Sequence, residues 1–233
     1  NEIEALLKKT GFNVTSVREY AGSEEVFKMI GQVSQSPRIL HIATHGYFFP
    51  DPDRAHSAKS GVAHDSAISE GTAKAASNKP KLEFGTKESV FKISEHPMLR
   101  SGLIMSGGNA GWKGEKTLEG REDGVLTAYE ISQMNLSNTE LVVLSACETG
   151  LGEIQGNEGV YGLQRAFKIA GVMYIIMSLW QVPDKQTSML MTTFYKKWLE
   201  EKMSIPDAFH AAQKELRDIG LDPYQWAGFV LVE

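Results

Sequence analysis

The chain has 233 residues, of which 42% are apolar, and it carries a formal net charge of −5 at pH 7. This length and composition suffice for one substantial hydrophobic core, so a single domain is expected over residues 1–233. The acidic balance argues against nucleic acid or an anionic membrane as the main partner, because either would require a concentrated positive field.

A single cysteine, Cys147, excludes an internal disulfide, and no apolar run reaches the roughly 18 to 20 residues of a membrane helix. With no secretory leader at its start, the chain is expected to be cytoplasmic. It begins at Asn1 without a methionine and continues directly into the helix-like stretch NEIEALLKKTG. We therefore expect it to be a piece of a longer polypeptide.

Short apolar runs bounded by glycine, proline or polar residues predict buried parallel strands. In chain order the strands are expected at 38–45, 101–107, 140–147 and 172–180, with a weaker one at 12–17 and a last one at 226–233. Helical patterns lie between them, at about 23–35, about 127–133, 157–171, 184–201 and 205–220. Alternating strands and helices predict an α/β fold in which helices cover both faces of a mostly parallel sheet of about six strands.

Residues 51–92 differ in kind from the rest of the chain. They are rich in Ala, Ser, Lys, Gly and Asp and show no sustained hydrophobic period. Such a segment buries too little apolar surface to offset its ordering entropy, so we expect a flexible insertion. Its lysines and Arg54 make it a candidate for self-processing.

Two histidines stand four residues apart in HIATHG, at His41 and His45. On a helix this spacing serves one metal ion, but the surrounding run predicts a strand, where four residues span roughly 13 Å. The zincin pattern also requires a glutamate where this chain has Ile42. No metal is therefore expected, and His41, in mid-strand, is expected to be structural.

His45 and Cys147 each end a predicted strand and are each followed by a glycine-containing turn. Ligands of open parallel sheets bind outside the carboxyl ends of the strands, so the imidazole and the thiol would face one crevice if the strands are neighbours. That pairing serves nucleophilic cysteine catalysis. The alternative is a small buried thiol and a satisfied polar histidine.

The segment CETGLGE also allows three other interpretations. A cysteine phosphatase would need arginine where the chain has Glu153, and a P-loop would need Lys-Ser or Lys-Thr after its glycines. GLGEIQG imitates a dinucleotide loop, but its glycine spacing differs, and Glu148 and Glu153 would repel a pyrophosphate. A nucleotide-binding module therefore ranks below catalysis, and no cofactor is expected.

Many ordered motifs together carry a family resemblance, and they cover nearly the whole chain apart from 51–92. They are HIATHG, SGLIMSGGNAGW, EDGVLTAYEI, ELVVLSACETGLGEIQGNEGVYGLQRAFKIAG, IIMSLWQVPDKQT and PYQWAGFVLVE. The chain closely resembles the CHAT domain, a caspase-like and separase-like family of cysteine peptidases in clan CD. The resemblance implies the caspase–haemoglobinase fold and a catalytic dyad of His45 and Cys147. It also implies an oxyanion hole made by the backbone N–H groups of Gly46 and Cys147.

The spacing of the dyad departs from the caspase pattern. Cys147 lies 102 positions after His45, against roughly 50 in caspases, and leaving out the 42 residues of 51–92 reduces this to 60. Caspases also carry glutamine two places before the cysteine, where this chain has Ser145. Specificity for aspartate is therefore not implied.

The segment LWQVPD resembles the separase segment that supplies an acidic floor to the substrate pocket. Gln181 in that role would accept a neutral side chain, whereas Asp184 would favour a basic one, although Asp184 equally suits the N-cap of the next helix. Trp180 lines the pocket wall or belongs to the core. Glu122 and Asp123 suit a solvated loop before a helix cap better than a substrate contact.

Family behaviour implies a protein substrate and regulation by a partner or an upstream helical-repeat domain, in bacterial defence or programmed cell death. Neither nucleic acid nor a membrane is expected as a direct partner. The alternative function is a catalytically inactive protein-interaction domain of the same fold, because motif residues alone do not establish that the loops close into a working site.

Overall fold

A computed structural model describes residues 2–49, 94, 96–114, 122–145 and 158–233. The insertion predicted at 51–92 and the nucleophile predicted at Cys147 both lie outside these residues. The described helices are α1 (Glu2–Lys9), α2 (Glu24–Lys28), α5 (Gly108–Lys113), α6 (Ala128–Ser132), α7 (Glu158–Ile169), α8 (Asp184–Leu199) and α9 (Ile205–Asp218), with 3₁₀ turns at η1 (Glu19–Ala21) and η2 (Pro223–Gln225). The described strands are β1 (Ile39–Ile42), β2 (His45–Phe48), β3 (Ser101–Ile104), β4 (Val125–Thr127), β5 (Leu141–Leu144), β6 (Tyr174–Ser178) and β7 (Phe229–Val232).

The central sheet has four strands in the order β1-β5-β6-β7 among the described residues, rather than the six expected. β1, β5 and β6 run parallel, as predicted, whereas β7 is antiparallel to β6. The stretch 12–17, expected to be a weak strand, is not one. Phe12 and Val14 are partly buried against the core, but residues 15–17 are exposed, and no described strand pairs with this stretch.

A second sheet of three antiparallel strands, in the order β2-β3-β4, accounts for one of the two strands missing from the central sheet, and the unformed strand at 12–17 accounts for the other. The apolar run at 38–45, expected to be one strand, divides after Ile42, and His45 begins β2 in the second sheet. The run at 101–107 forms β3 of that same sheet instead of a parallel strand in the first. A buried apolar run indicates a strand but not its partner, which explains both errors.

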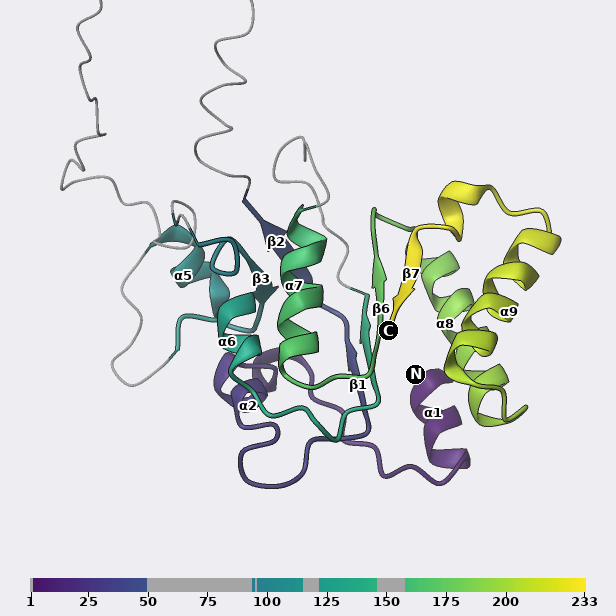
Figure 1. Cartoon of the computed structure of the whole chain (residues 1–233), viewed down its shortest axis with the longest axis horizontal. Coiled ribbons are helices and arrows are strands. Elements are labelled where there is room, and N and C mark those ends of the chain that lie inside the picture. Colours follow the sequence, from purple (N-terminus) through teal and green to yellow (C-terminus); the bar gives the residue numbers. More distant parts are fainter. Residues whose placement is uncertain (1, 50–93, 95, 115–121, 146–157) are drawn as a thin grey trace, which may run out of the picture.

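Helices cover both faces of the central sheet, as predicted. α1, α8 and α9 pack on one face around Leu141, Val143 and Ile176, while α6 and α7 pack on the other around Val142 and Ile175. This alternation follows from the two-residue period of a strand. Figure 1 shows α8 and α9 on one side of β6 and β7, and α6 and α7 on the other.

The core on the α7 side continues from the central sheet into the second sheet. Leu103 of β3 and Leu126 of β4 are fully buried in the same cluster as Phe167 of α7. Gly162 lets α7 approach β3 closely, because a Cβ at this glycine would lie 2.2 Å from Ser101 Oγ. The two sheets are thereby held by one layer of helices.

Helix boundaries follow the capping residues. The Ser23 hydroxyl caps α2, Ser204 caps α9, and Thr127 with Glu130 forms a capping box at α6. α2 is shorter than the helix expected at 23–35, and turns follow it. Among the described residues, no helix combines the length and the apolarity that a membrane crossing requires.

Candidate functional site

The carboxyl ends of β1 and β5 lie side by side. Ile42 is paired with Leu144 at the ends of the two parallel strands. The N–H of Ser145 then donates to the carbonyl of Ile42 at 3.0 Å, and the Ser145 hydroxyl donates to the same oxygen at 3.3 Å. Ser145, the last described residue of this segment, therefore lies beside the end of β1, and His45 follows Ile42 by three residues.

His45 is the first residue of β2 and is exposed. Its Cα is paired with that of Ile104 in β3, and the hydroxyl of the preceding residue, Thr44, donates to the Ile104 carbonyl. This side-chain hydrogen bond fixes the point at which the chain passes from the first sheet to the second. His45 is consequently anchored by its backbone just beyond the end of β1.

The N–H of Gly46 points away from β3. The backbone N–H of Phe49 donates to the carbonyl of Arg100, so these two residues form a hydrogen-bonded pair between β2 and β3. Every second pair along the two strands is bonded in the same way, which gives the pairs 47 with 102 and 45 with 104. Antiparallel ladders alternate between bonded and non-bonded pairs, which puts Gly46 with Leu103 in the non-bonded phase. In the part of the chain that the structure describes, no strand pairs with the other edge of β2, and the Gly46 N–H faces that edge.

His41 has the structural role predicted for it. Its Nδ1 lies 3.1 Å from the hydroxyl of Tyr195 in α8, and the two rings stack with centroids 5.9 Å apart. Burial lowers the pKa of His41 to about 4, so the ring is neutral at physiological pH. His41 lies in the central sheet and His45 in the second sheet.

Trp180, Gln181 and Asp184 follow the carboxyl end of β6, the next strand beyond β5. Trp180 is half-buried and packs against the core on the α8 side. Gln181 and Asp184 are both exposed. Asp184 is the first residue of α8, with Pro183 at the N-cap, so the alternative that Asp184 itself is the N-cap is wrong by one position. An acidic residue in the first turn still suits the helix dipole.

A comparison with known protein families shows which family the chain belongs to. The family model of the CHAT domain matches residues 1–233. The chain belongs to the CHAT domain family. This family is related to the caspase-like peptidases of clan CD, and a mixed α/β fold whose central sheet contains parallel strands agrees with that relationship.

Two curated relatives share part of this CHAT domain. Mouse tetratricopeptide repeat protein 28 is 32% identical over 111 residues, which are 46% of this chain and 4% of the relative. Human tetratricopeptide repeat protein 28 is 31% identical over 110 residues, again 46% of this chain and 4% of the relative. The matched region is thus a small fraction of each relative's length.

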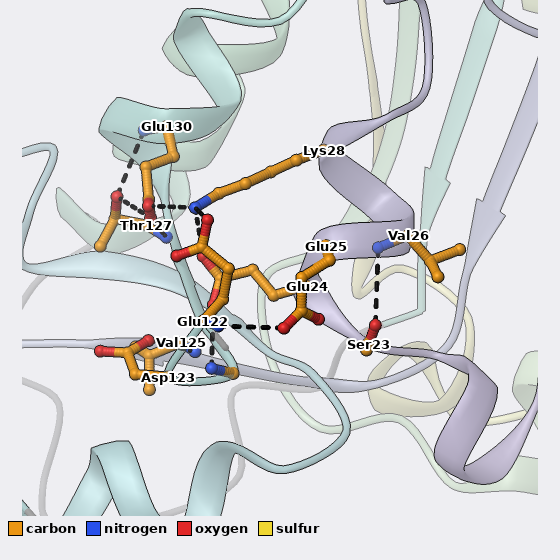
Figure 2. Close-up of polar contacts among 11 residues, drawn as sticks. Ser23, Glu24, Glu25, Val26, Lys28, Glu122, Asp123, Val125, Thr127 and Glu130 are labelled. Atoms are coloured by element: carbon orange, nitrogen blue, oxygen red, sulfur yellow. Dashed lines mark hydrogen bonds and ion pairs between the residues drawn. The ribbon is translucent and has the colours of Figure 1, made fainter. Parts of the chain in front are cut away.

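The CHAT domain also contains a charged cluster that sequence reasoning missed. Lys28 Nζ lies 2.5 Å from Glu24, 2.6 Å from Glu130 and 3.1 Å from Glu122. Figure 2 shows the end of the Lys28 side chain directed toward these carboxylates. The three carboxylates lie within 4.8 Å of one another, the spacing of a metal site, but the Lys28 ammonium already supplies their positive charge. The cluster joins α2 to the segment before β4 and to α6.

Burial sets the electrostatics of this cluster. Glu24 is 1% exposed, and burial raises its pKa to about 7 even though Lys28 opposes the shift. Burial alone would lower the pKa of Lys28, but its hydrogen bonds to the three carboxylates outweigh that effect and raise it. The second oxygen of Glu24 accepts the N–H of Gly124 at 2.8 Å. Glu24 therefore holds both the side chain of Lys28 and the backbone turn at Gly124.

Glu122 and Asp123 hold the loop before β4. Besides its ion pair with Lys28, Glu122 donates its backbone N–H to the Glu25 carboxylate at 2.9 Å. Asp123 accepts the N–H of Val125, and Thr127, rather than either acid, caps α6. The prediction of a loop before a helix cap agrees with these contacts.

The remaining histidines also have no common site among the described residues. His96 accepts the N–H of Met98 and contacts the Tyr129 ring, and His210 is exposed on α9. His56 and His64 lie outside the described residues. The spacing Glu24–Lys28 and the T-x-x-E pattern at Thr127 were the available sequence signals for the missed cluster.

Proposed function

We propose that this CHAT domain is a cysteine endopeptidase that hydrolyses a peptide bond of a protein substrate with His45 and Cys147. The observation that supports the proposal most directly is the hydrogen bond from Ser145 to Ile42. It joins the two chain segments that lead to the imidazole and to the thiol, at the edge of a parallel sheet where ligands bind.

In the proposed reaction, the Cys147 thiolate attacks the carbonyl carbon of the scissile bond. The protonated imidazole of His45 then donates its proton to the departing amine, which leaves an acyl group on the sulfur. A water molecule, deprotonated by His45, attacks this thioester, and the thiolate leaves. The acid product is released, and the dyad returns to its starting state.

The oxyanion formed in each step would be held by the N–H groups of Gly46 and Cys147. The ladder phase of β2 supports the first donor, because it directs the Gly46 N–H away from β3. Preorganised donors of this kind typically contribute about 3 kcal/mol of transition-state stabilisation each. Glycine has no side chain to obstruct a substrate that approaches this backbone.

The substrate pocket is proposed to lie at the carboxyl ends of β5 and β6, with Ser145, Trp180, Gln181 and Asp184 as its lining. The exposure of Gln181 and Asp184 is compatible with contact to a substrate side chain. A pocket floor formed by Gln181 would select a neutral residue before the cut, and one formed by Asp184 a basic residue.

The proposed setting is a cytoplasmic peptidase in bacterial defence or programmed cell death, regulated by a partner or a helical-repeat domain. A single cysteine in 233 residues suits a reducing compartment. The name of the mouse and human relatives denotes tetratricopeptide repeats, which agrees with association between a CHAT domain and a repeat region.

A mixed peptide library analysed by mass spectrometry tests the proposal. Wild-type protein is expected to produce cleavages that Cys147→Ala and His45→Ala abolish, while His210→Ala, which changes an exposed histidine on α9, leaves them intact. The residues flanking each cut then identify the pocket preference. Incubation of the active enzyme followed by an SDS gel also tests self-processing within 51–92.

Two outcomes would contradict the proposal. Cleavages that persist in Cys147→Ala would assign them to another nucleophile or to a contaminant. No cleavage by wild-type protein, in the presence of its repeat region as well, would favour the alternative of a catalytically inactive interaction domain with the same fold.

A further inference from the structure

Trp180 and Tyr224 form an aromatic pair at the carboxyl edge of the central sheet. Their rings stack with centroids 5.7 Å apart and an angle of 18° between the planes. The indole N–H of Trp180 donates to the backbone carbonyl of Tyr224 at 2.8 Å. The pair thus joins the segment after β6 to the segment before β7.

The backbone around Tyr224 is fixed in advance. Asp222 caps the 3₁₀ turn η2 by accepting the Tyr224 N–H at 2.8 Å, and Pro223 restricts the first position of that turn. The indole N–H of Trp226 donates to Leu221 and holds the same loop from its other side. The ring of Tyr224 therefore extends from a constrained backbone and not from a freely moving loop.

The position of Trp180 is equally constrained. A Cβ at Gly228 would lie 2.8 Å from two atoms of the Trp180 ring and 2.7 Å from Val182, so the indole lies directly against the glycine backbone. The N–H of Leu179 donates to the Gly228 carbonyl at 2.7 Å, which aligns the end of β6 with the beginning of β7. Figure 1 shows these two strands side by side.

Tyr224 nevertheless remains 57% exposed. An aromatic ring held rigidly by its neighbours, with this much surface in water, offers a flat apolar face at low entropic cost to a ligand. Because the pair begins two residues after β6, it lies at the same edge as Ser145, which follows the parallel strand β5. A substrate bound at that edge is placed to contact it.

We infer that the Trp180–Tyr224 pair is a specificity-determining subsite that binds an aromatic side chain of the substrate near the scissile bond. This inference rests on the proposed function for its substrate, and it assigns Tyr224 a role beyond the pocket residues named above. The incoming ring stacks on, or packs edge-to-face against, the exposed surface of Tyr224. Aromatic pairs of this kind typically change an affinity by about 2- to 12-fold.

Peptide binding to the Cys147→Ala protein tests the inference without requiring catalysis. The immobilised protein is incubated with a mixed library of short peptides, and the retained peptides are identified by mass spectrometry. We expect enrichment of Phe, Tyr or Trp at one position, a reduction of this enrichment by about 2- to 12-fold in Tyr224→Ala, and its retention in Tyr224→Phe. Tyr20→Ala serves as the matched control, since Tyr20 is 92% exposed and lies on η1.

The outcomes separate this inference from the proposed function. Absence of aromatic enrichment, or equal enrichment with Tyr224→Ala in a protein that still melts cooperatively, overturns the subsite. If wild-type cleavage depends on Cys147 while Tyr224→Ala leaves the cleaved sequences unchanged, the peptidase proposal stands and the subsite fails. Enrichment that depends on Tyr224 in a protein that never cleaves would leave an aromatic-binding site for peptides at Trp180 and Tyr224, whereas the peptidase proposal, and with it the position near a scissile bond, would fail.

Discussion

The backbone N–H of Ser145 donates to the carbonyl of Ile42 across the last rung of the parallel β1–β5 pair, at 3.0 Å. His45 follows Ile42 by three residues and Cys147 follows Ser145 by two. The hydrogen bond therefore fixes the described end of the β5 segment beside the end of β1, the strand that His45 closely follows. The dyad remains a proposal that requires Cys147 to lie near His45, and the following experiment tests it.

The reactivity of Cys147 provides a test of the dyad that needs no substrate. If His45 promotes thiolate formation, His45→Ala is expected to slow alkylation of the thiol by iodoacetamide about tenfold or more near pH 6.5. Since the chain has one cysteine, mass spectrometry of the labelled protein measures the rate at this residue alone. The neutral variant His41→Gln is the control and should alkylate at the wild-type rate. Equal alkylation rates for wild type and His45→Ala would show that the imidazole of His45 does not activate the thiol of Cys147.

The buried imidazole of His41 predicts a loss of stability in acid. Its pKa is about 4 in the folded protein, against about 6.5 in the unfolded chain, so the unfolded state takes up the proton first as the pH falls. The contribution is complete above pH 6.5 and is lost progressively toward pH 4, up to about 3 kcal/mol. Urea unfolding at several pH values measures this loss.

A neutral variant isolates the histidine from other titrating groups. The free energy of unfolding of His41→Gln should fall less than that of wild type between pH 7 and pH 4.5, although the variant is less stable at pH 7. His210→Gln, which changes an exposed histidine, should retain the wild-type pH dependence. Parallel pH profiles for wild type and His41→Gln would contradict a buried neutral imidazole.

Two lysines, Lys28 and Lys8, each follow a glutamate by four residues, but their substitution is expected to lower the free energy of unfolding by unequal amounts. Lys28→Met leaves the buried Glu24 carboxylate without its ammonium partner, which typically costs about 3 to 5 kcal/mol. Lys8 makes the equivalent ion pair with Glu4, four residues earlier in α1, but is well exposed. Lys8→Met should therefore change the free energy of unfolding very little. Similar costs for the two variants in urea unfolding would show that burial of Glu24 does not determine the energetics.

Sequence pattern predicted the parts of the fold that depend on local apolar runs. The runs at β5 and β6 are four and five residues long and buried on both faces. The helices α7 and α9 have clear amphipathic periods, and α8 has an acidic first turn and a basic last turn. The break after Ile42 was missed because it depends on the Thr44 hydroxyl reaching Ile104, 60 residues away. β3 was assigned to the wrong sheet for the same reason.

The candidate site was predictable to the extent that it follows from strand ends. His45 stands at a boundary between an apolar run and a glycine, which the sequence displays directly. The Lys28–Glu130 contact joins positions 102 residues apart, and the Trp180–Tyr224 pair joins positions 44 apart. No local period encodes such contacts, so they emerge from the packed structure alone.

Two glycines with left-handed backbone separate the cost of strain from the cost of steric overlap. Gly107 and Gly124 have φ of 90° and 75°, and a Cβ at Gly124 would lie 2.4 Å from the Gly108 nitrogen. At Gly107 no heavy atom of the described structure lies within 4 Å of that position. We expect Gly107→Ala to lower the free energy of unfolding by about 1 kcal/mol, from backbone strain alone. Gly124→Ala should lower it by at least about 3 kcal/mol, because overlap with Gly108 also displaces the Gly124 N–H from the Glu24 carboxylate. Thermal and urea unfolding of both variants measure the difference, and equal losses would mean that the 105–108 turn yields easily and does not fix the start of β4.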